Sequence, residues 1–270
     1  MPIIKINDAD IYYQDFNENS SDETSKETIV FAHGLLWDNE MFAPQIEQLK
    51  SKYRCIAFDF RGQGKSESTD SGYDMGSLAL DTKSLIEQLV DGPVHFLGLS
   101  MGGFIGMRLA IHHPELLKSL MLLETTADPE PEANKPKYRK LAFIAKWLGV
   151  SLIANKTMAI MFSQSFLNDP NKKALKNEWK AKLGTLNRWT FGKAVNGVVD
   201  RNGIYGMLNK IELPTLIVVG DEDVATTPAK AQRMHEAIKG SHLVTIEKAG
   251  HTSSIEQPEA VLKAIQDFLD

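Results

Sequence analysis

Ser100 has the sequence context of a nucleophile. It stands in Gly98-Leu99-Ser100-Met101-Gly102, after the apolar run 94–97 and before a helical pattern that begins near Gly103. A sharp strand-to-helix turn needs small residues on both sides of the serine, because the strand and the helix approach closely there. The hydroxyl then stands at the start of a helix, whose dipole favours developing negative charge. The predicted chemistry is attack of Ser100 on an acyl carbonyl.

A base and an acid that would activate this serine follow later in the chain. Asp223, in Gly220-Asp221-Glu222-Asp223, comes after the apolar run 215–219, and His251 comes after the run 243–246. The chain order serine, acid, histidine suits three groups that stand at the strand ends of one sheet. We expect His251 to take the serine proton and later return it to the leaving group, while the acid orients the imidazole.

The sequence contains more than one candidate for the catalytic acid. Asp223 lies furthest beyond its strand, where a loop side chain can turn toward His251, so it is the preferred acid. Asp221 and Glu222 are expected to shape the loop or to face solvent. Glu124 follows the run 120–123 at the same edge of the sheet and is a competing candidate.

Two backbone amides are predicted to stabilise the oxyanion that this attack creates. One is the N–H of Met101, directly after the serine. The other is the N–H of Leu35 in His33-Gly34-Leu35-Leu36-Trp37, which follows the apolar run 28–32. Each such donor contributes roughly 3 kcal/mol in comparable sites. His33 is expected to shape this loop; a role for it as the catalytic base is the alternative.

The elements that position these groups are short apolar runs that alternate with helical patterns. The runs are typical of strands buried on both faces of a parallel sheet. We expect strands over 3–16 with a turn near Asn7, and over 28–32, 54–58, 94–98, 120–123, 215–219 and 243–246, and helices over 76–90, 103–111 and 258–269. This alternation predicts an α/β fold with a doubly wound, mostly parallel sheet. Residues 17–27 have the composition of a polar loop.

Residues 127–203 interrupt the alternation. They contain no convincing strand and carry helical patterns with large apolar side chains, so they are predicted to be an insertion between two parts of the core, 1–126 and 204–270. Six apolar side chains, most of them in this segment, are candidates for a substrate pocket: Trp37, Phe143, Trp147, Met161, Phe162 and Trp189. The arginines in or near the segment, Arg139, Arg188 and Arg201, are expected at the surface.

Composition narrows the function classes. The chain has 270 residues and a formal net charge of −5, which gives no electrostatic reason to expect nucleic acid or an anionic membrane surface as partner. The single cysteine, Cys55, lies in a strand pattern and is expected to be a core residue. No apolar run is long enough to span a membrane, and the first residues do not read as a signal peptide, so a cytoplasmic location is expected. No metal, haem, flavin or nucleotide motif is found, and no cofactor is expected.

Together these motifs resemble those of the α/β-hydrolase superfamily, in the branch of small carboxylesterases, enol-lactonases, cofactor-free haloperoxidases and carbon–carbon-bond hydrolases. The matching runs are His33-Gly34, 59–66 (Asp-Phe-Arg-Gly-Gln-Gly-Lys-Ser), 98–103, 220–223 with Pro228, and Gly250-His251. The resemblance implies an α/β-hydrolase fold whose insertion, 127–203, is a helical cap over the pocket. It implies that Asp59 and Arg61 brace a loop without taking part in catalysis, and it supports Asp223 over Glu124.

The expected function is therefore hydrolysis of small to medium carboxylic esters through an acyl-enzyme, with a small-molecule ester or lactone as the only predicted partner. A lactonase, or a carbon–carbon hydrolase of aromatic degradation, uses the same catalytic groups and remains an alternative. A hydrolase-fold binding protein without turnover is the most distant alternative. The sequence does not separate these substrates.

Overall fold

The computed structural model describes residues 2–16 and 26–270, and the described residues form one eight-stranded sheet. Residues 17–25 of the predicted polar loop lie outside them. The strands are β1 (Ile3–Ile6), β2 (Ala9–Phe16), β3 (Thr28–Ala32), β4 (Arg54–Phe58), β5 (Val94–Leu99), β6 (Leu117–Leu123), β7 (Thr215–Gly220) and β8 (His242–Ile246). Their order across the sheet is β1-β2-β4-β3-β5-β6-β7-β8.

The sheet is mostly parallel, which confirms the predicted α/β class. β1 pairs with β2 and β2 with β4 in antiparallel fashion, and all later pairs are parallel. Every residue of β3, β5 and β7 is buried, as expected for strands covered on both faces. The register pairs Leu99 with Leu123 and Gly220 with Ile246, so the segments that follow β5, β6, β7 and β8 leave the sheet at the same edge.

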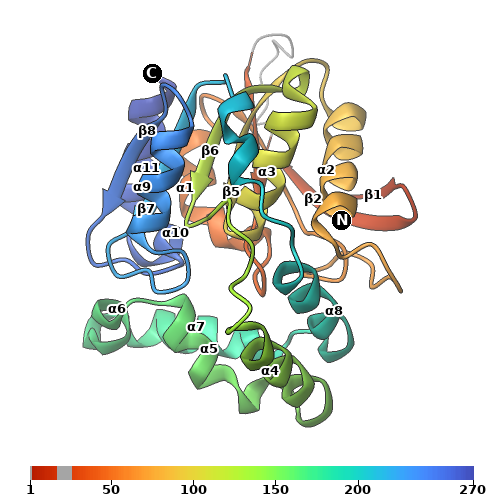
Figure 1. The fold of residues 1–270 in the computed structure, drawn as a ribbon, viewed down its shortest axis with the longest axis vertical. Coiled ribbons are helices and arrows are strands. Elements are labelled where there is room, and N and C mark those ends of the chain that lie inside the picture. Colours follow the sequence, from red (N-terminus) through yellow and green to blue (C-terminus); the bar gives the residue numbers. More distant parts are fainter. Residues whose placement is uncertain (1, 17–25) are drawn as a thin grey trace.

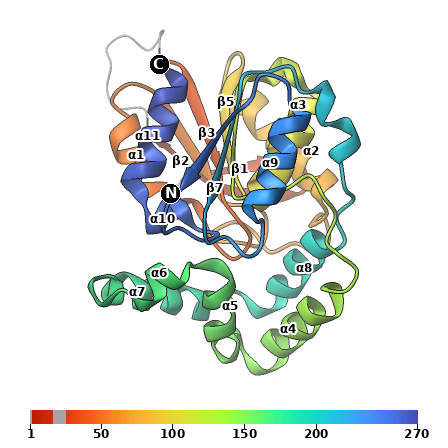
Figure 2. The ribbon, with the colours of Figure 1, turned by 60° about the vertical axis from the view of Figure 1, so that its left-hand side comes forward.

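Helices cover both faces of the sheet (Figures 1 and 2). α1 and α11 pack on one face, and α2, α3 and α9 pack on the other. The helices are α1 (Ala43–Leu49), α2 (Met75–Leu89), α3 (Met101–His112), α4 (Lys135–Leu148), α5 (Ala154–Met161), α6 (Gln164–Asn168), α7 (Lys173–Gly184), α8 (Arg188–Val199), α9 (Pro228–Ala237), α10 (Ser253–Glu256) and α11 (Pro258–Leu269). Short 3₁₀ helices are η1 (Asn39–Phe42), η2 (Pro114–Leu116), η3 (Val150–Leu152), η4 (Pro170–Lys172) and η5 (Tyr205–Lys210).

Residues 127–203 contain five α-helices, α4 to α8, and no strand. They connect β6 to β7 and lie together at one end of the molecule, below the sheet in Figure 1. The prolines of the opening segment, Pro129 and Pro131, precede the first of these helices, and Gly149 ends it with a φ of 94°, a conformation that favours glycine. We call residues 127–203 the helical segment.

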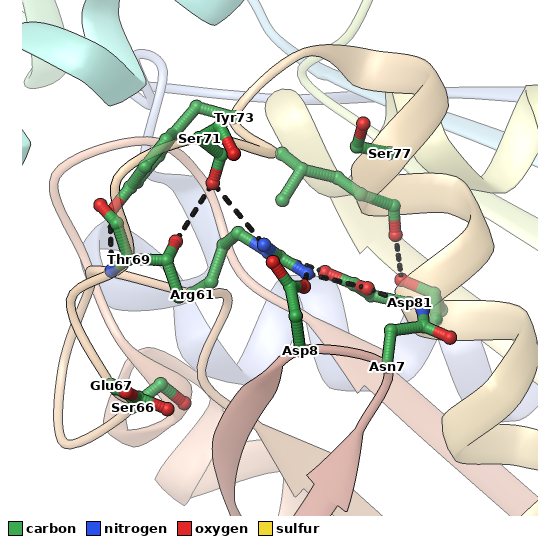
Figure 3. Close-up of polar contacts among 12 residues, drawn as sticks. Asn7, Asp8, Arg61, Ser66, Glu67, Thr69, Ser71, Tyr73, Ser77 and Asp81 are labelled. Atoms are coloured by element: carbon green, nitrogen blue, oxygen red, sulfur yellow. Dashed lines mark hydrogen bonds and ion pairs between the residues drawn. The ribbon is translucent and has the colours of Figure 1, made fainter.

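The loop after β4 is held by a buried ion pair (Figure 3). The Arg61 guanidinium contacts both carboxylate oxygens of Asp81 at 2.7 and 2.8 Å, and it also donates to Asp8 at 2.8 Å. Arg61 is 3% exposed, so removal of Asp81 would leave this buried charge with only the exposed carboxylate of Asp8 and would lower the stability. Asp59 accepts from the backbone N–H groups of Asn39 and Lys65. These contacts support the loops that reach the candidate site.

Candidate active site

Ser100 stands at the junction of β5 and α3 in a strained conformation. Its φ is 51° and its ψ is −106°, a region that residues with a side chain rarely adopt. The neighbouring glycines make the turn possible: a Cβ on Gly98 would lie 2.3 Å from the carbonyl oxygen of Gly102, and a Cβ on Gly102 would lie 2.1 Å from that of Ala32. The turn therefore has the form expected of a nucleophile elbow.

The structure brings Ser100, His251 and Asp223 together in one chain of hydrogen bonds. The Nε2 atom of His251 lies 2.8 Å from the Ser100 hydroxyl oxygen, and its Nδ1 atom lies 2.9 Å from Oδ2 of Asp223. All three side chains are almost fully buried. The acid and the histidine come from the loops after β7 and β8, which leave the sheet at the same edge as the end of β5.

Asp223 is held in its ionised form. Burial by itself would raise the pKa of the carboxyl group, but the charge of His251 and hydrogen bonds from His251 and Thr226 outweigh it and lower the pKa to about 2. The backbone N–H groups of Ala225 and Thr226 also donate to Oδ1 at 2.7 and 2.9 Å. Asp223 is therefore a carboxylate at neutral pH, fixed on both oxygens.

Thr226 is a fourth member of this chain that the sequence reasoning missed. Its hydroxyl donates to Oδ2 of Asp223 at 2.6 Å, so its oxygen is free to accept from Nδ1 of His251 at 3.1 Å. The Nδ1 proton thus has two acceptors, and both hold the tautomer that leaves Nε2 facing Ser100. The only signal in the sequence is a threonine three residues after an aspartate, a spacing typical of loop turns.

Glu124, the competing acid, does not contact His251. It follows β6 with a φ of 41°, it is fully buried, and neither carboxyl oxygen has a hydrogen-bond partner within residues 2–16 and 26–270. Burial raises the pKa of this carboxyl well above its usual value and so favours its neutral form. A carboxyl group without a hydrogen bond to the imidazole does not orient it. The structure thus separates two candidates that the sequence left open.

The other two acids of the loop after β7 make structural contacts. Asp221 accepts from the backbone N–H of Ala249 at 3.3 Å. Glu222 accepts from the backbone N–H of Ser165 at 3.0 Å and from its hydroxyl, which joins the loop to α6. Both contacts hold neighbouring loops together rather than touching His251.

The two amides predicted to bind an oxyanion lie beside Ser100. Met101 is the first residue of α3, and Leu35 lines the same cavity as Ser100; neither N–H has a hydrogen-bond partner among the described residues.

Gln63, which the sequence reasoning missed, contacts the segments that carry both amides. Its side-chain oxygen accepts from the N–H of Leu36 at 3.0 Å, and its amide nitrogen lies 3.8 Å from the sulfur of Met101.

His33 shapes the loop that carries Leu35. Its Nε2 accepts from the backbone N–H of Phe60 at 3.0 Å, so Nδ1 carries the proton and donates to the carbonyl of Gly34 at 2.7 Å. Burial lowers the pKa of this imidazole, so the ring stays neutral. Both ring nitrogens are occupied by backbone groups, and His33 is therefore a structural residue.

Glu256 anchors the loop that carries His251, and it too was missed. Its Oε1 accepts from the backbone N–H groups of Gly250 at 2.9 Å and Thr252 at 3.3 Å, on either side of the histidine. The carboxyl group is fully buried, and this burial raises its pKa. The only sign of this role in the sequence is that Glu256 follows His251, the candidate base, by five residues.

A mostly apolar cavity opens beside Ser100 and His251 under the helical segment. Of the six predicted pocket residues only Met161 lines it. Trp37 and Phe162 are buried and pack against each other, at 5.9 Å between ring centres, while Phe143, Trp147 and Trp189 lie on the outer surface. The apolar lining consists instead of Leu35, Leu36, Phe104, Leu141, Ala142, Ile153, Ile160, Met161, Phe191, Val195, Val198, Val199 and Ala225.

One wall of the cavity is polar. Arg201, expected at the surface, is 7% exposed; it pairs with Glu130 at 3.2 Å and lies over the ring of Phe104 at 4.5 Å. Its Nε and Nη1 donate to the carbonyls of Asp128 and Val198. Tyr138 lines the same cavity beside this pair. An ion pair whose two charges cancel thus faces a mostly apolar cavity.

Two kinds of feature are absent from residues 2–16 and 26–270. No three His, Cys, Asp or Glu side chains within them lie close enough to hold a metal ion. No helix among them is long and apolar enough to cross a membrane. Cys55 is a buried residue of β4 whose burial raises the pKa of the thiol to about 12, so it is not a nucleophile at neutral pH.

The sequence is similar to those of known proteins over most of its length. Residues 27–258 match the family described as alpha/beta hydrolase fold. The chain is 27% identical to 3-oxoadipate enol-lactonase 2 of Acinetobacter baylyi, over 98% of this chain and 97% of that protein. It is 26% identical to the pimeloyl-acyl-carrier-protein methyl ester esterase of Neisseria meningitidis, over 94% of this chain and 96% of that protein.

The same likeness extends to three dimensions. The crystal structure of the enol-lactonase from Burkholderia xenovorans superposes with a TM-score of 0.90 at 26% identity, and the match covers 99% of both chains. The coverage includes the helical segment as well as the sheet.

Proposed function

Because the chain belongs to the α/β-hydrolase fold family, we propose that it is a serine hydrolase that cleaves carboxylic esters of small to medium acyl chain length. The observation that carries the proposal is the chain of hydrogen bonds from Asp223 through His251 to Ser100, at 2.9 and 2.8 Å. Relatives named as an enol-lactonase and a methyl ester esterase support hydrolysis of an ester bond.

In the first half of the proposed reaction the Ser100 oxygen attacks the ester carbonyl while Nε2 of His251 takes the hydroxyl proton. The carbonyl oxygen becomes an oxyanion, which the N–H groups of Leu35 and Met101 bind. When the tetrahedral intermediate collapses, His251 gives its proton to the departing alkoxide, and the alcohol leaves an acyl-Ser100 ester. Asp223 and Thr226 hold the imidazolium throughout.

In the second half water takes the place of the alcohol. His251 accepts a proton from the water as its oxygen attacks the acyl carbonyl, and the same two amides bind the second oxyanion. Collapse returns the proton from His251 to the Ser100 oxygen and releases the carboxylic acid. The apolar lining of the cavity suits a hydrocarbon acyl chain. We further propose that the helical segment acts as a cap on a core formed by residues 1–126 and 204–270.

Hydrolysis of a series of p-nitrophenyl esters from acetate to decanoate tests the activity, and labelling with a fluorophosphonate tests the nucleophile. We expect turnover and labelling in the wild type, and loss of both in Ser100→Ala, with kcat lower by roughly 10⁴-fold or more. Ser119→Ala is the matched control, because Ser119 is also buried but bonds to His95 on β5. No turnover together with an unlabelled Ser100 would overturn the proposal.

A lactonase is the second candidate, because two of the similar proteins are named enol-lactonases. A lactone is a cyclic ester, and the same groups would open it with the alcohol retained on the acyl chain. Acid release from a panel of lactones and their open-chain methyl esters separates the two substrates. A kcat/KM that is at least about tenfold higher for a lactone than for its open-chain ester would assign the lactone as the substrate.

A further inference from the structure

The outer surface of the helical segment carries an exposed aromatic patch formed by Phe143, Trp147 and Trp189. These side chains are 64%, 56% and 49% exposed. The rings of Phe143 and Trp147 lie 6.4 Å apart, and those of Trp147 and Trp189 lie 6.0 Å apart. Large aromatic side chains gathered at a surface mark a site of interaction. None of the three lines the cavity beside Ser100.

Positive charge surrounds this patch. The Lys146 ammonium lies 5.5 Å from the rings of both Trp147 and Trp189, and the Arg188 guanidinium lies 5.2 Å from Trp189. Lys140 precedes Phe143 by three residues and Trp147 by seven, so the three lie on one stripe of α4. Within the part of the chain that the structure describes, no carboxylate forms an ion pair with Lys140, Lys146 or Arg188.

The charge around the patch is part of a wider asymmetry. The helical segment holds fourteen Lys and Arg but only six Asp and Glu, a formal charge of +8. Since the whole chain carries −5, the remainder carries −13. The helical segment is therefore a basic pole of a molecule with a negative net charge, and an anionic surface would attract this end of it.

We propose that the aromatic patch and its flanking cations dock the protein on an anionic lipid surface. Tryptophan and phenylalanine beside lysine and arginine are the side chains that bind at the boundary of headgroups and acyl chains. The rings enter this boundary while Lys140, Lys146 and Arg188 pair with lipid phosphates. A symmetric dimer through the same face would bring the cations of two copies together, so charge favours the lipid over a second copy.

Docking would also place the cavity near the lipid. α4 lies at the end of the molecule opposite the C-terminus in Figure 1. While its outer stripe carries Phe143 and Trp147, its inner stripe carries Tyr138, Leu141 and Ala142, which line the cavity. One helix thus separates the docking face from the space beside Ser100. The docking proposal itself does not depend on the proposed ester hydrolysis.

Sedimentation with vesicles tests the proposal. The probes are vesicles of phosphatidylcholine alone and of phosphatidylcholine with about 30% phosphatidylglycerol, at salt concentrations from about 0.05 to 0.5 M. We expect the protein to bind the anionic vesicles, with a blue shift of tryptophan emission, and to bind the neutral ones much more weakly. Salt is expected to weaken the binding, because ion pairs with headgroups are screened.

Two variants separate the contributions. Phe143→Ser/Trp147→Ser/Trp189→Ser removes the rings, and Lys140→Glu/Lys146→Glu/Arg188→Glu reverses the charges. We expect each to weaken binding by at least about 100-fold. Loss of three cations, at roughly a factor of five for each, already gives this factor before the repulsion from the three new carboxylates. Loss of three apolar rings from the boundary region removes a contribution of at least similar size. The matched control, Lys210→Glu/Lys239→Glu/Lys263→Glu, makes the same change in net charge on the core and is expected to reduce binding far less. Circular dichroism shows whether each variant is folded.

Three results would overturn the inference. The first is no binding of the wild type to anionic vesicles at low salt. The second is binding that the charge-reversal variant and its control reduce equally. The third is binding to an acidic polypeptide, or self-association in analytical ultracentrifugation, that requires the patch while binding to vesicles does not. That last result would assign the face to a protein partner.

Discussion

Ser163 donates two hydrogen bonds to one oxygen of the Glu256 carboxyl, from its backbone N–H at 2.9 Å and from its hydroxyl at 2.6 Å. The other oxygen of Glu256 accepts from Gly250 and Thr252, which flank His251. Ser163 is the N-cap residue of α6, which belongs to the helical segment. A single buried side chain therefore sets the position of the histidine loop relative to the segment that covers the cavity.

Replacement of this group tests whether it positions His251. In Glu256→Gln an amide N–H₂ takes the place of one carboxylate oxygen. Because it faces backbone or hydroxyl donors, these buried donors lose their acceptor, which costs about 1–3 kcal/mol of stability. We expect a lower melting temperature and, at a temperature where the variant is fully folded, a kcat reduced by roughly tenfold. Glu259→Gln, on the exposed start of α11, is the matched control. An unchanged kcat in the folded Glu256→Gln variant would limit Glu256 to stability.

The second prediction concerns Thr226. Thr226→Val keeps the shape of the side chain but removes the hydroxyl shared by Asp223 and His251. We expect kcat for an ester to fall by roughly 5- to 20-fold with little change in KM, because the lost contact acts on the imidazole rather than on substrate. Thr226→Ser should restore most of the activity, and Thr227→Val, at the next position, should leave it unchanged. Equal kcat values for Thr226→Val and Thr227→Val would contradict the assigned role.

The third prediction concerns the pH dependence of stability that Glu124 causes. Its pKa is raised in the folded protein, so between the usual glutamate pKa and this raised value the folded state binds more protons than the unfolded state. The free energy of unfolding then falls as the pH rises, by up to about 1.4 kcal/mol per pH unit. Glu124→Gln removes this titration.

Denaturant unfolding at several values from about pH 5 to pH 8 measures this difference. We expect the stability of Glu124→Gln relative to the wild type to increase with pH over this window. Glu212→Gln, an exposed position after η5, serves as the control and should track the wild type. A constant difference between Glu124→Gln and the wild type would mean that Glu124 titrates alike in the folded and unfolded states.

The fourth prediction concerns the charge of the acyl group. Glu130 neutralises Arg201 at the wall of the cavity, so the wild type should hydrolyse p-nitrophenyl hexanoate with a higher kcat/KM than the mono-p-nitrophenyl ester of adipic acid. Glu130→Gln leaves the Arg201 cation unpaired and should shift this ratio toward the carboxylate ester by about tenfold or more. Glu132→Gln, an exposed neighbour, should not change the ratio. A wild-type preference for the adipate ester would show that Arg201 already receives a carboxylate.

Much of the fold followed from local pattern. The buried runs 28–32 and 54–58 coincide with β3 and β4, and the helix expected over 258–269 coincides with α11. These elements carry a strong signal, because one or both faces are continuously apolar. α9 was not predicted, since only Ala231 and Met234 of its ten residues are buried and the apolar stripe is short.

The sequence by itself determined the chemistry that Ser100, Asp223 and His251 are proposed to perform. Each stands in the segment that follows a parallel strand, and parallel strands place these segments at one edge of the sheet whatever the details of packing. Only the tertiary structure decided the rest. Whether Glu124 or Asp223 contacts the imidazole depends on angstrom-scale distances between loops. Whether a tryptophan such as Trp147 enters the cavity or faces solvent depends on how α4 is rotated about its axis, because an aromatic residue contributes the same to the composition on either face of a helix.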